Sequence, residues 1–247
     1  MANSPIHVIV YGDPGAGKST FAATFPKPMR VWLFDAHGKD TPYLKWATDW
    51  KEEVDHYGTT CMVSATAAIT IEKFHDFDPE SSNGWHRFMR RRDAYAKTLE
   101  YQNDLTLVVD SITFMELAAR KYDQYVTNKG CKDPRKHFGA STDALEETLM
   151  LKLMGLPINV VTIAHIDTER DDVHGSMIFN PSAPGRLKKR IPAAYGEFYH
   201  AYVTKDDEGQ AMYLLQTRAD NRYNASSQIE APSPSWQSYD SLWPVPA

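Results

Sequence analysis

Residues 12–20 read Gly-Asp-Pro-Gly-Ala-Gly-Lys-Ser-Thr, and this stretch decides how the rest of the chain is interpreted. It matches the pattern G-x-x-x-x-G-K-[ST] at every fixed position. The apolar run from His7 to Tyr11 before it is predicted to be a buried strand, and the residues after Lys18 are predicted to open a helix. A glycine-rich turn between a strand and a helix directs backbone N–H groups and the positive end of the helix at an anion. The sequence therefore predicts a phosphate-binding loop that takes a nucleoside triphosphate.

The residues of this loop have roles that follow from phosphate chemistry. Lys18 is expected to reach the β- and γ-phosphates, and the Ser19 hydroxyl is expected to ligate Mg²⁺. ATP and Mg²⁺ are therefore the expected cofactors. The predicted nucleotide-binding residues of the loop are Gly12, Asp13, Pro14, Gly15, Ala16, Gly17, Lys18, Ser19 and Thr20.

A second apolar run ends in an acidic residue. Residues 105–110 are predicted to form a strand, and Asp110 is its last residue. A parallel strand beside the strand of the loop would carry its last carboxylate to the magnesium side, which is the Walker B arrangement. Asp110 is therefore predicted to bind the nucleotide's Mg²⁺ together with Ser19. The alternative is an acid that only caps the next helix.

Composition limits the partners of the chain. A net charge of −5 over 247 residues excludes a uniformly basic coat, so contact with nucleic acid would need local patches. Cys61 and Cys131 are isolated in the sequence, which predicts free thiols in a reducing compartment. No apolar run approaches the ~18 residues that a membrane helix needs. We also expect no signal peptide before the first strand. We therefore expect a cytoplasmic protein with no membrane partner.

Strands alternate with helices along most of the chain. The predicted strands are residues 7–11, 30–35, 105–110 and 158–165. This alternation is typical of an α/β fold with a mostly parallel central sheet flanked by helices. Residues 59–84 are interpreted as a strand at 60–63 and a helix at 67–74, and a C-terminal β-hairpin is predicted at 198–204 and 211–217. We expect an ATP-binding domain over residues 1–224 and a Ser/Pro-rich C-terminal tail over 225–247.

The order of these motifs resembles a known family, the phage nucleotide-binding proteins of the RecA-like class. Their best-known branch is the Sak-type ATP-dependent single-strand annealing proteins. The resemblance covers residues 5–224 and is carried by GDPGAGKST, LFDAHGKDTPYL, VVDSIT, VVTIAHID and PGRLKKRIPAAYGEFY. It implies a RecA-like P-loop NTPase core that binds single-stranded DNA in recombination or replication of a phage genome in a bacterial host cell. It also makes a single-strand-binding protein a candidate partner.

The resemblance assigns roles by position. Lys18, Ser19 and Asp110 match the ATP and magnesium motifs, and His165 matches the polar sensor of the γ-phosphate at the end of a strand. The alternative for His165 is a strand-end histidine that is hydrogen-bonded to the backbone. The domain implied is a minimal RecA-like core.

The chain departs from the family pattern after its second strand. RecA-like ATPases commonly carry Asp-x-Glu there, whereas this chain reads Asp35-Ala36-His37. A neutral imidazole such as that of His37 positions water less firmly than a carboxylate, and Asp40 or Glu116 are the candidate substitutes. We therefore expect slow hydrolysis, with ATP acting as an assembly ligand or as a switch of DNA affinity.

Two segments correspond to the DNA-binding loops of RecA relatives. The first is 127–138 and the second is 167–190. Cationic side chains can follow phosphates, and aromatic side chains can meet bases without reading sequence. A solvated run of charges is the alternative for each loop. The candidate DNA-binding residues are Lys132, Arg135, Lys136, Phe138, Phe179, Arg186, Lys188, Lys189 and Arg190, and a further basic cluster comprises Arg87, Arg90, Arg91 and Arg92.

The resemblance also implies a homo-oligomer, ring or filament, with nucleotide between subunits. A neighbouring arginine would then reach the γ-phosphate, and Arg218 and Arg222 are the candidates, with plain surface arginines as the alternative. Two other functions stay open. One is a P-loop phosphotransferase resembling a nucleotide kinase, for which we find no arginine-rich lid; the other is a nucleotide-gated interaction protein that does not bind DNA.

Overall fold

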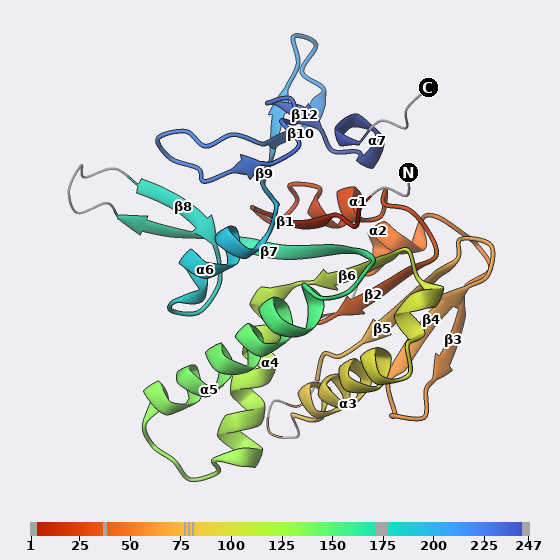
Figure 1. Ribbon diagram of the computed structural model, residues 1–247, viewed down its shortest axis with the longest axis vertical. Helices are drawn as coiled ribbons and strands as arrows, with labels where there is room; N and C mark the ends of the chain where they lie inside the picture. Colours follow the sequence, from red (N-terminus) through yellow and green to blue (C-terminus); the bar gives the residue numbers. More distant parts are fainter. Residues whose placement is uncertain are drawn as a thin grey trace.

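A twelve-stranded sheet forms the centre of the molecule (Figure 1). The structure is a computed structural model, and it describes residues 4–36, 39–76, 78, 80, 82–170 and 177–243. In the described residues the strand order is β12-β10-β9-β1-β7-β6-β2-β5-β4-β3, with β8 beside β7 and β11 beside β9. The mostly parallel α/β architecture predicted from the sequence is confirmed.

The centre of the sheet is parallel and its edges are antiparallel. The parallel strands are β9 (Glu197–Lys205), β1 (His7–Gly12), β7 (Asn159–Arg170), β6 (Thr106–Asp110), β2 (Met29–Leu33) and β5 (Ile69–Lys73). The edge strands are β10 (Ala211–Gln216), β12 (Ser235–Trp236) and β11 (Ser226–Ser227) at one end, and β4 (Thr60–Ser64) and β3 (Lys51–Val54) at the other. The outer half of β7 pairs instead with β8 (Met177–Pro181), and this hairpin projects from the body of the molecule (Figure 1).

Alternation along the central strands divides the core between the two faces of the sheet. Ile9 and Tyr11 of β1 belong to one buried cluster, whereas Val8 and Val10 belong to another. Successive side chains of a strand point to opposite faces, and a parallel sheet is covered on both, so its strands are apolar throughout. This explains why these strands could be recognised in the sequence as continuous apolar runs.

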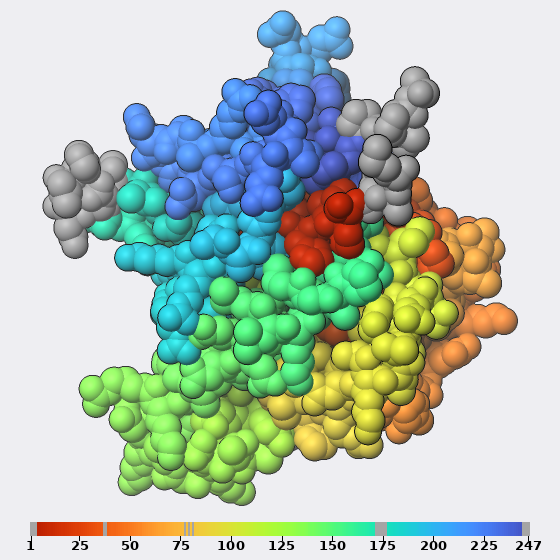
Figure 2. All heavy atoms as spheres, viewed as in Figure 1, coloured from red at the N-terminus to blue at the C-terminus, as the bar shows by residue number. Residues whose placement is uncertain are grey.

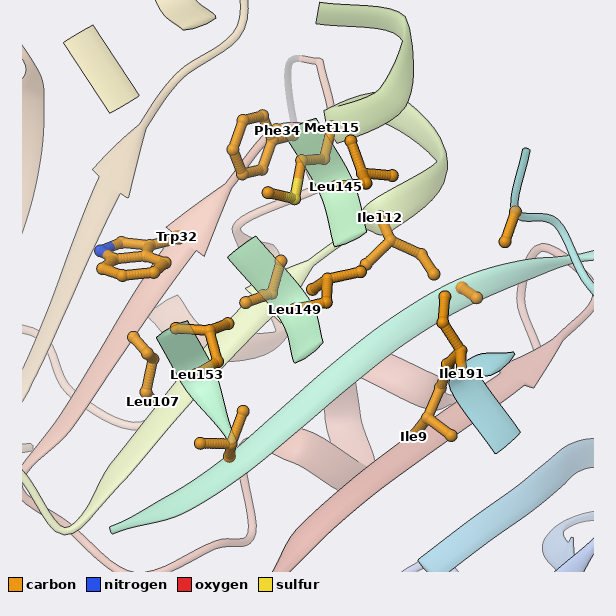
Figure 3. Close-up of a cluster of buried hydrophobic side chains, with 14 of the residues drawn as sticks. Ile9, Trp32, Phe34, Leu107, Ile112, Met115, Leu145, Leu149, Leu153 and Ile191 are labelled. Carbon is orange, nitrogen blue, oxygen red and sulfur yellow. The ribbon is translucent and has the colours of Figure 1, made fainter. Parts of the chain in front are cut away.

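Helices cover both faces. The first cluster receives side chains from α3 (Asn83–Lys97), α4 (Ile112–Tyr122), α5 (Pro134–Glu146) and α6 (Leu187–Ala194). Helical turns at Asp123–Thr127 and Glu147–Leu153 continue α4 and α5, and a short turn at Glu100–Asn103 follows α3. The second cluster receives side chains from α1 (Lys18–Ala22), α2 (Thr41–Leu44) and α7 (Tyr239–Leu242). Figure 3 shows part of the first cluster, including Ile9, Trp32, Leu107, Met115, Leu145 and Leu149.

Three local predictions need correction. The helix predicted at 67–74 is the strand β5, because a short apolar run that is buried in a sheet resembles a helical segment in sequence. The second predicted DNA-binding loop, 167–190, contains regular structure: β7 continues to Arg170, β8 pairs with it in the antiparallel direction, and α6 follows. The first loop is shorter than expected, because Asp133 caps α5 by accepting a hydrogen bond from the N–H of Arg135. The C-terminal hairpin is observed as β9 and β10.

The Ser/Pro-rich segment from residue 225 packs against the phosphate-binding loop. The side-chain amide of Gln237 donates hydrogen bonds to the carbonyls of Ala16 (2.7 Å) and Leu214 (3.0 Å). The rings of Tyr239 and Trp243 contact Phe25, with centroids 5.1 and 5.5 Å apart. On the face shown in Figure 2, the blue C-terminal residues border the red N-terminal residues. The separate domain boundary at 224/225 stays a prediction.

Gly12 gives the first testable prediction. A Cβ at Gly12 would lie 2.2 Å from the backbone carbonyl oxygen of Ala201 on β9. Gly12→Ala must therefore push β1 and β9 apart, and we expect it to destabilise the protein by about 1–3 kcal/mol in urea unfolding. Gly139→Ala is the control, because the space around a Cβ there is open and alanine favours the helix interior by about 0.5–1 kcal/mol. Equal stability of the two variants would contradict this packing.

Candidate nucleotide-binding site

A cavity of about 550 Å³ lies where the carboxyl ends of the parallel strands meet. Its lining includes Lys18 and Ser19 after β1, Asp35 after β2, Asp110 of β6 and His165 of β7. In open α/β sheets ligands bind outside the carboxyl ends of the strands. The structure therefore brings the predicted P-loop and Walker B residues together in one cavity.

The phosphate-binding loop has the backbone that its glycines allow. Gly15 and Gly17 both have φ of +83°, a left-handed conformation that strains other residues. The buried ammonium of Lys18 donates hydrogen bonds to the carbonyls of Gly12 and Asp13, each 2.8 Å long. Burial lowers the pKa of Lys18 to about 8, although Asp110 and Asp35 oppose that shift. A buried cation in this position fits an anionic ligand, because phosphate oxygens can replace the solvation that the cation lacks.

Hydrogen bonds fix the carboxylate of Asp110, and one of them comes from a residue whose role the sequence did not predict. Its carboxylate accepts a hydrogen bond from the hydroxyl of Tyr43 on α2 (2.8 Å). Burial, and then the neighbouring Asp35, raise the pKa of Asp110 to about 6, while hydrogen bonds from Ser19 and Tyr43 and the charge of Lys18 act in the opposite direction. Tyr43 lies in the stretch LFDAHGKDTPYL, but no role was predicted for it from the sequence, and its hydrogen bond to Asp110 identifies it.

The residues present fit a magnesium ion. Among the described residues no three His, Cys, Asp or Glu side chains are grouped to bind a metal by themselves. In phosphate sites Mg²⁺ is typically held by one or two carboxylates, with phosphate oxygens and water as its other ligands. The hydroxyl of Ser19 and the carboxylate of Asp110 supply oxygen donors of this kind beside Lys18.

Asp35 lines the cavity, although in the sequence it was noted only within Asp35-Ala36-His37 and without a role in the site. It is 4% exposed, and its Oδ1 accepts hydrogen bonds from the backbone N–H (3.2 Å) and the hydroxyl (2.7 Å) of Ser111. Its Oδ2 lies 3.7 Å from Nε2 of His165. The strand register could have suggested Asp35, because Leu33 of β2 lies opposite Asp110 of β6.

His165 connects this cavity to a second one. Its backbone N–H donates to the hydroxyl of Thr113 (3.1 Å), and that hydroxyl donates to the carbonyl of Ser182 (3.4 Å). The N–H of Ser182 returns a hydrogen bond to the carbonyl of His165 (2.7 Å). Thr113 and Ser182 both line a cavity of about 510 Å³. We call it the α5–α6 groove, because its other walls are α4, α5 and the segment 183–188 before and within α6.

Two of the candidate water-orienting residues, Asp40 and Glu116, do not line the nucleotide cavity. Asp40 pairs with Lys73 (2.7 Å) and does not line the cavity. Glu116 accepts hydrogen bonds from Arg120 (3.1 Å) and Ser141 (2.8 Å) and lines the α5–α6 groove. His37 lies outside the described residues.

The first set of candidate DNA-binding residues lies on and before α5. Lys132, Arg135 and Lys136 are exposed, and the side chain of Arg135 pairs with Asp133 (3.3 Å). Phe138 is 47% exposed and lines the α5–α6 groove, with the guanidinium of Arg120 4.6 Å from its ring centre.

Several residues of the second set already have partners. Arg186 pairs with Asp143 and Glu146 (2.6 Å each), and Arg190 also pairs with Glu146. Lys188 pairs with Asp167 (2.6 Å) and Glu169 (2.8 Å). Phe179 stacks on Tyr223, with ring centres 4.7 Å apart, and Lys189 is exposed. The free positive charge here is therefore smaller than the sequence suggests.

The remaining arginines separate into structural and exposed ones. Arg91 and Arg92 of the α3 cluster are buried and pair with acids, Arg91 with Glu72 (2.9 Å) and Arg92 with Asp93 (2.9 Å). The cluster is therefore not a continuous surface patch. Arg218 and Arg222 are exposed and do not line the nucleotide cavity of their own chain.

Comparison with known proteins identifies the family. A family model described as "AAA domain" matches residues 4–227. The chain belongs to this AAA domain family. A comparison with curated proteins found no match. No described helix of this AAA domain is long and apolar enough to cross a membrane.

Solved structures share the fold of this AAA domain. One is a prototypical ATPase from the type III secretion system of pathogenic bacteria, with 14% identity, 83% of this chain and 53% of that chain covered, and a TM-score of 0.50. Another is the assembled ATPase EscN of enteropathogenic E. coli in complex with its central stalk EscO, with 12% identity, 84% and 43% covered, and a TM-score of 0.49. The chain thus spans about half the length of these ATPases. The RecA-like P-loop ATPase fold predicted from the sequence is confirmed.

Asp110 gives the second prediction. Raising its pKa from 3.8 to about 6 disfavours the charged carboxylate by about 3 kcal/mol. This cost is fully present above pH 6, declines as the pH falls from about 6 toward the unfolded value of 3.8, and disappears below that value. In metal-free buffer at pH 7.5 we expect Asp110→Asn to increase the free energy of unfolding, by on the order of 1–2 kcal/mol because it keeps the shape and loses the charge. At pH 5 the gain should be about half as large, because the carboxyl group of the unfolded chain stays ionised down to about pH 4. An equal gain at both pH values would contradict the raised pKa.

Proposed function

We propose that this AAA domain binds ATP with Mg²⁺ in the cavity at the P-loop, and that the bound nucleotide controls its affinity for single-stranded DNA. It acts as a recombinase or annealing protein of the phage type, with slow hydrolysis. The observation that carries this proposal is the set of hydrogen bonds through which Thr113 and Ser182 join His165 to the α5–α6 groove. A displacement of β7 at the nucleotide must therefore disturb the wall of the groove.

Nucleotide binding is supported by the groups around the P-loop. Lys18 would exchange its two carbonyl partners for phosphate oxygens, and the loop N–H groups would cradle the phosphates. Ser19 and Asp110 would hold Mg²⁺, which neutralises phosphate charge when bound.

DNA binding is supported by the chemistry around the groove. Phe138 offers an exposed ring on which a base can stack. Lys136 on α5, Lys189 on α6 and Lys132 just before α5 are exposed cations. The ion pairs of Arg186 and Arg190 are also exposed, by 51% and 53% of their side chains. Surface pairs of this kind are worth about 0–1 kcal/mol, so DNA phosphates can displace the carboxylates.

Assembly into a homo-oligomer is supported by the lack of an arginine in the described lining of the nucleotide cavity. No arginine among the described residues lines it, and the cations that do are Lys18, Lys39 and Lys45. An arginine supplied by a neighbour stabilises phosphoryl transfer in many P-loop proteins. We propose that Arg218 or Arg222 of an adjacent subunit has this role, in a ring or a filament. A single-strand-binding protein is the further partner that the proposal includes.

Anisotropy of a fluorescent oligo-dT tests the proposal. We expect MgATP to raise the affinity of the wild type about tenfold or more, since linked sites are typically coupled by 5–150-fold. With about three phosphate contacts, affinity should fall about 20-fold between 50 and 200 mM salt. Lys18→Ala should abolish the effect of MgATP while leaving nucleotide-free DNA binding in place.

Charge variants provide the matched control. Replacing Lys132, Lys136 and Lys189 by alanine should weaken DNA binding and flatten its salt dependence. Lys51→Ala, on the far edge strand β3, should change neither. Absence of binding at low salt with and without nucleotide would refute the DNA-binding part of the proposal.

A further inference from the structure

Two polar atoms face each other at the inner end of the nucleotide cavity. Oδ2 of Asp35 and Nε2 of His165 are 3.7 Å apart, slightly too far for a hydrogen bond. The Asp35 carboxylate is fixed by two hydrogen bonds from Ser111 to its other oxygen. Nε2 of His165 is buried and has no hydrogen-bond partner within the described part of the chain. Catalytic hydrogen bonds are often long before the substrate binds and shorten in the complex.

The nearest group decides which nitrogen of His165 carries the proton. A carboxylate only accepts hydrogen bonds, so the neutral ring is favoured with its hydrogen on Nε2, toward Asp35. Nδ1 is then an acceptor. The side chain of His165 is 21% exposed and lines the nucleotide cavity; since Nε2 is buried, that exposure falls on the rest of the ring, which includes Nδ1.

This tautomer conflicts with a γ-phosphate sensor. Ionised phosphate oxygens accept hydrogen bonds, and an unprotonated Nδ1 accepts them too, so the two would repel each other. A water molecule, in contrast, can donate a hydrogen bond to Nδ1. The acceptor therefore suits the water that attacks the phosphate better than it suits the phosphate itself.

We propose that Asp35 and His165 form a dyad in which His165 is the general base for ATP hydrolysis and Asp35 is the positioning residue that fixes its tautomer. This rests on the proposed binding of ATP in the same cavity. The water oxygen forms a bond to the γ-phosphorus and gives its proton to Nδ1. The bond between the γ-phosphorus and the β–γ bridging oxygen breaks, and its electron pair leaves with ADP. The proton then passes to the released phosphate or to solvent.

The dyad also gives a reason for the slow hydrolysis that we propose. Among the described residues that line the cavity, only Asp35 and Asp110 are carboxylates, and Asp110 is placed to hold the metal. Both hydrogen bonds from Ser111 hold Oδ1 of Asp35, and Oδ2 faces His165, so we assign Asp35 to the imidazole and not to the attacking water. The base is therefore a neutral imidazole, which attracts the proton of water less strongly than a carboxylate that faces it directly.

Nitrogen NMR of histidine-labelled protein tests the dyad without any activity. The chain has nine histidines, and His165→Gln identifies the signals of residue 165 by their loss. At pH 7.5 we expect the wild type to carry hydrogen on Nε2 and none on Nδ1. In Asp35→Asn the side-chain amide can donate to Nε2, so the hydrogen should move to Nδ1. A wild-type ring protonated on Nδ1 would overturn the proposal whether or not the protein binds ATP.

Single-turnover hydrolysis with enzyme in excess gives the second readout. Asp35→Asn should reduce the rate by at least 100-fold, because a wrong tautomer in a comparable histidine–aspartate pair costs about 10⁴-fold. The affinity for MgATP should change less than threefold. Ser111→Ala removes one of the two hydrogen bonds to Asp35 and should lower the rate about tenfold, and it serves if Asp35→Asn does not fold. Asp207→Asn, in the exposed turn between β9 and β10, should match the wild type.

Chemical rescue separates a base from a structural residue. His165→Ala should regain at least tenfold of its rate in added imidazole, while Asp35→Asn should not. Unchanged hydrolysis in Asp35→Asn would overturn the proposal, as would Asp35→Asn that hydrolyses normally once Mg²⁺ is raised, because Asp35 would then be a metal ligand. A wild type that fails to bind MgATP would instead refute the proposed function, and the NMR result would still decide the tautomer.

Discussion

Two buried carboxylates lie next to each other at the ends of β2 and β6, and most of the site depends on the groups that compensate their repulsion. Asp35 and Asp110 are 4% and 2% exposed. Burial and mutual repulsion disfavour two such charges, so neighbouring groups must compensate. Lys18 lies beside them, Tyr43 donates to Asp110, and Ser111 donates to Asp35. Each of these groups comes from a different element, so the order of the sheet is required for the charges to be tolerated.

This arrangement favours a ligand that brings its own cation and its own negative charge. Lys18 is short of solvation, and Asp110 is hard to ionise, with a pKa of about 6. A magnesium–triphosphate would supply phosphate oxygens to Lys18 and a metal ion to Asp110. The buried charges at this site therefore lower the stability of the fold, as expected where local stability is exchanged for function. The same reasoning connects the loop, α2 and the strand ends in a single energetic unit.

The sequence predicted those parts of the fold that depend on local chemistry. The loop around Lys18 and the buried parallel strands were recognised because glycines, a lysine and continuous apolar runs leave few alternatives. β5 was misassigned because Ile69–Lys73 is short and becomes a strand only by pairing with β2. The roles of Asp35 and Tyr43 were not predicted, because they come from register and from packing between distant elements. Likewise, the sequence suggests that Arg91 is a surface charge, and only the structure shows that it pairs with Glu72.

The account depends most on the coupling between the nucleotide cavity and the α5–α6 groove through Thr113. Its most direct test is a thermodynamic cycle that measures the affinity for oligo-dT with and without MgATP, in the wild type and in Thr113→Val. Valine keeps the shape of threonine but cannot accept from His165 or donate to Ser182. The account predicts that the variant still binds each ligand alone, within about threefold, while the mutual enhancement falls from about tenfold or more toward one. Full enhancement in Thr113→Val would contradict it, because the two cavities would then communicate by another route or the enhancement would not need this contact.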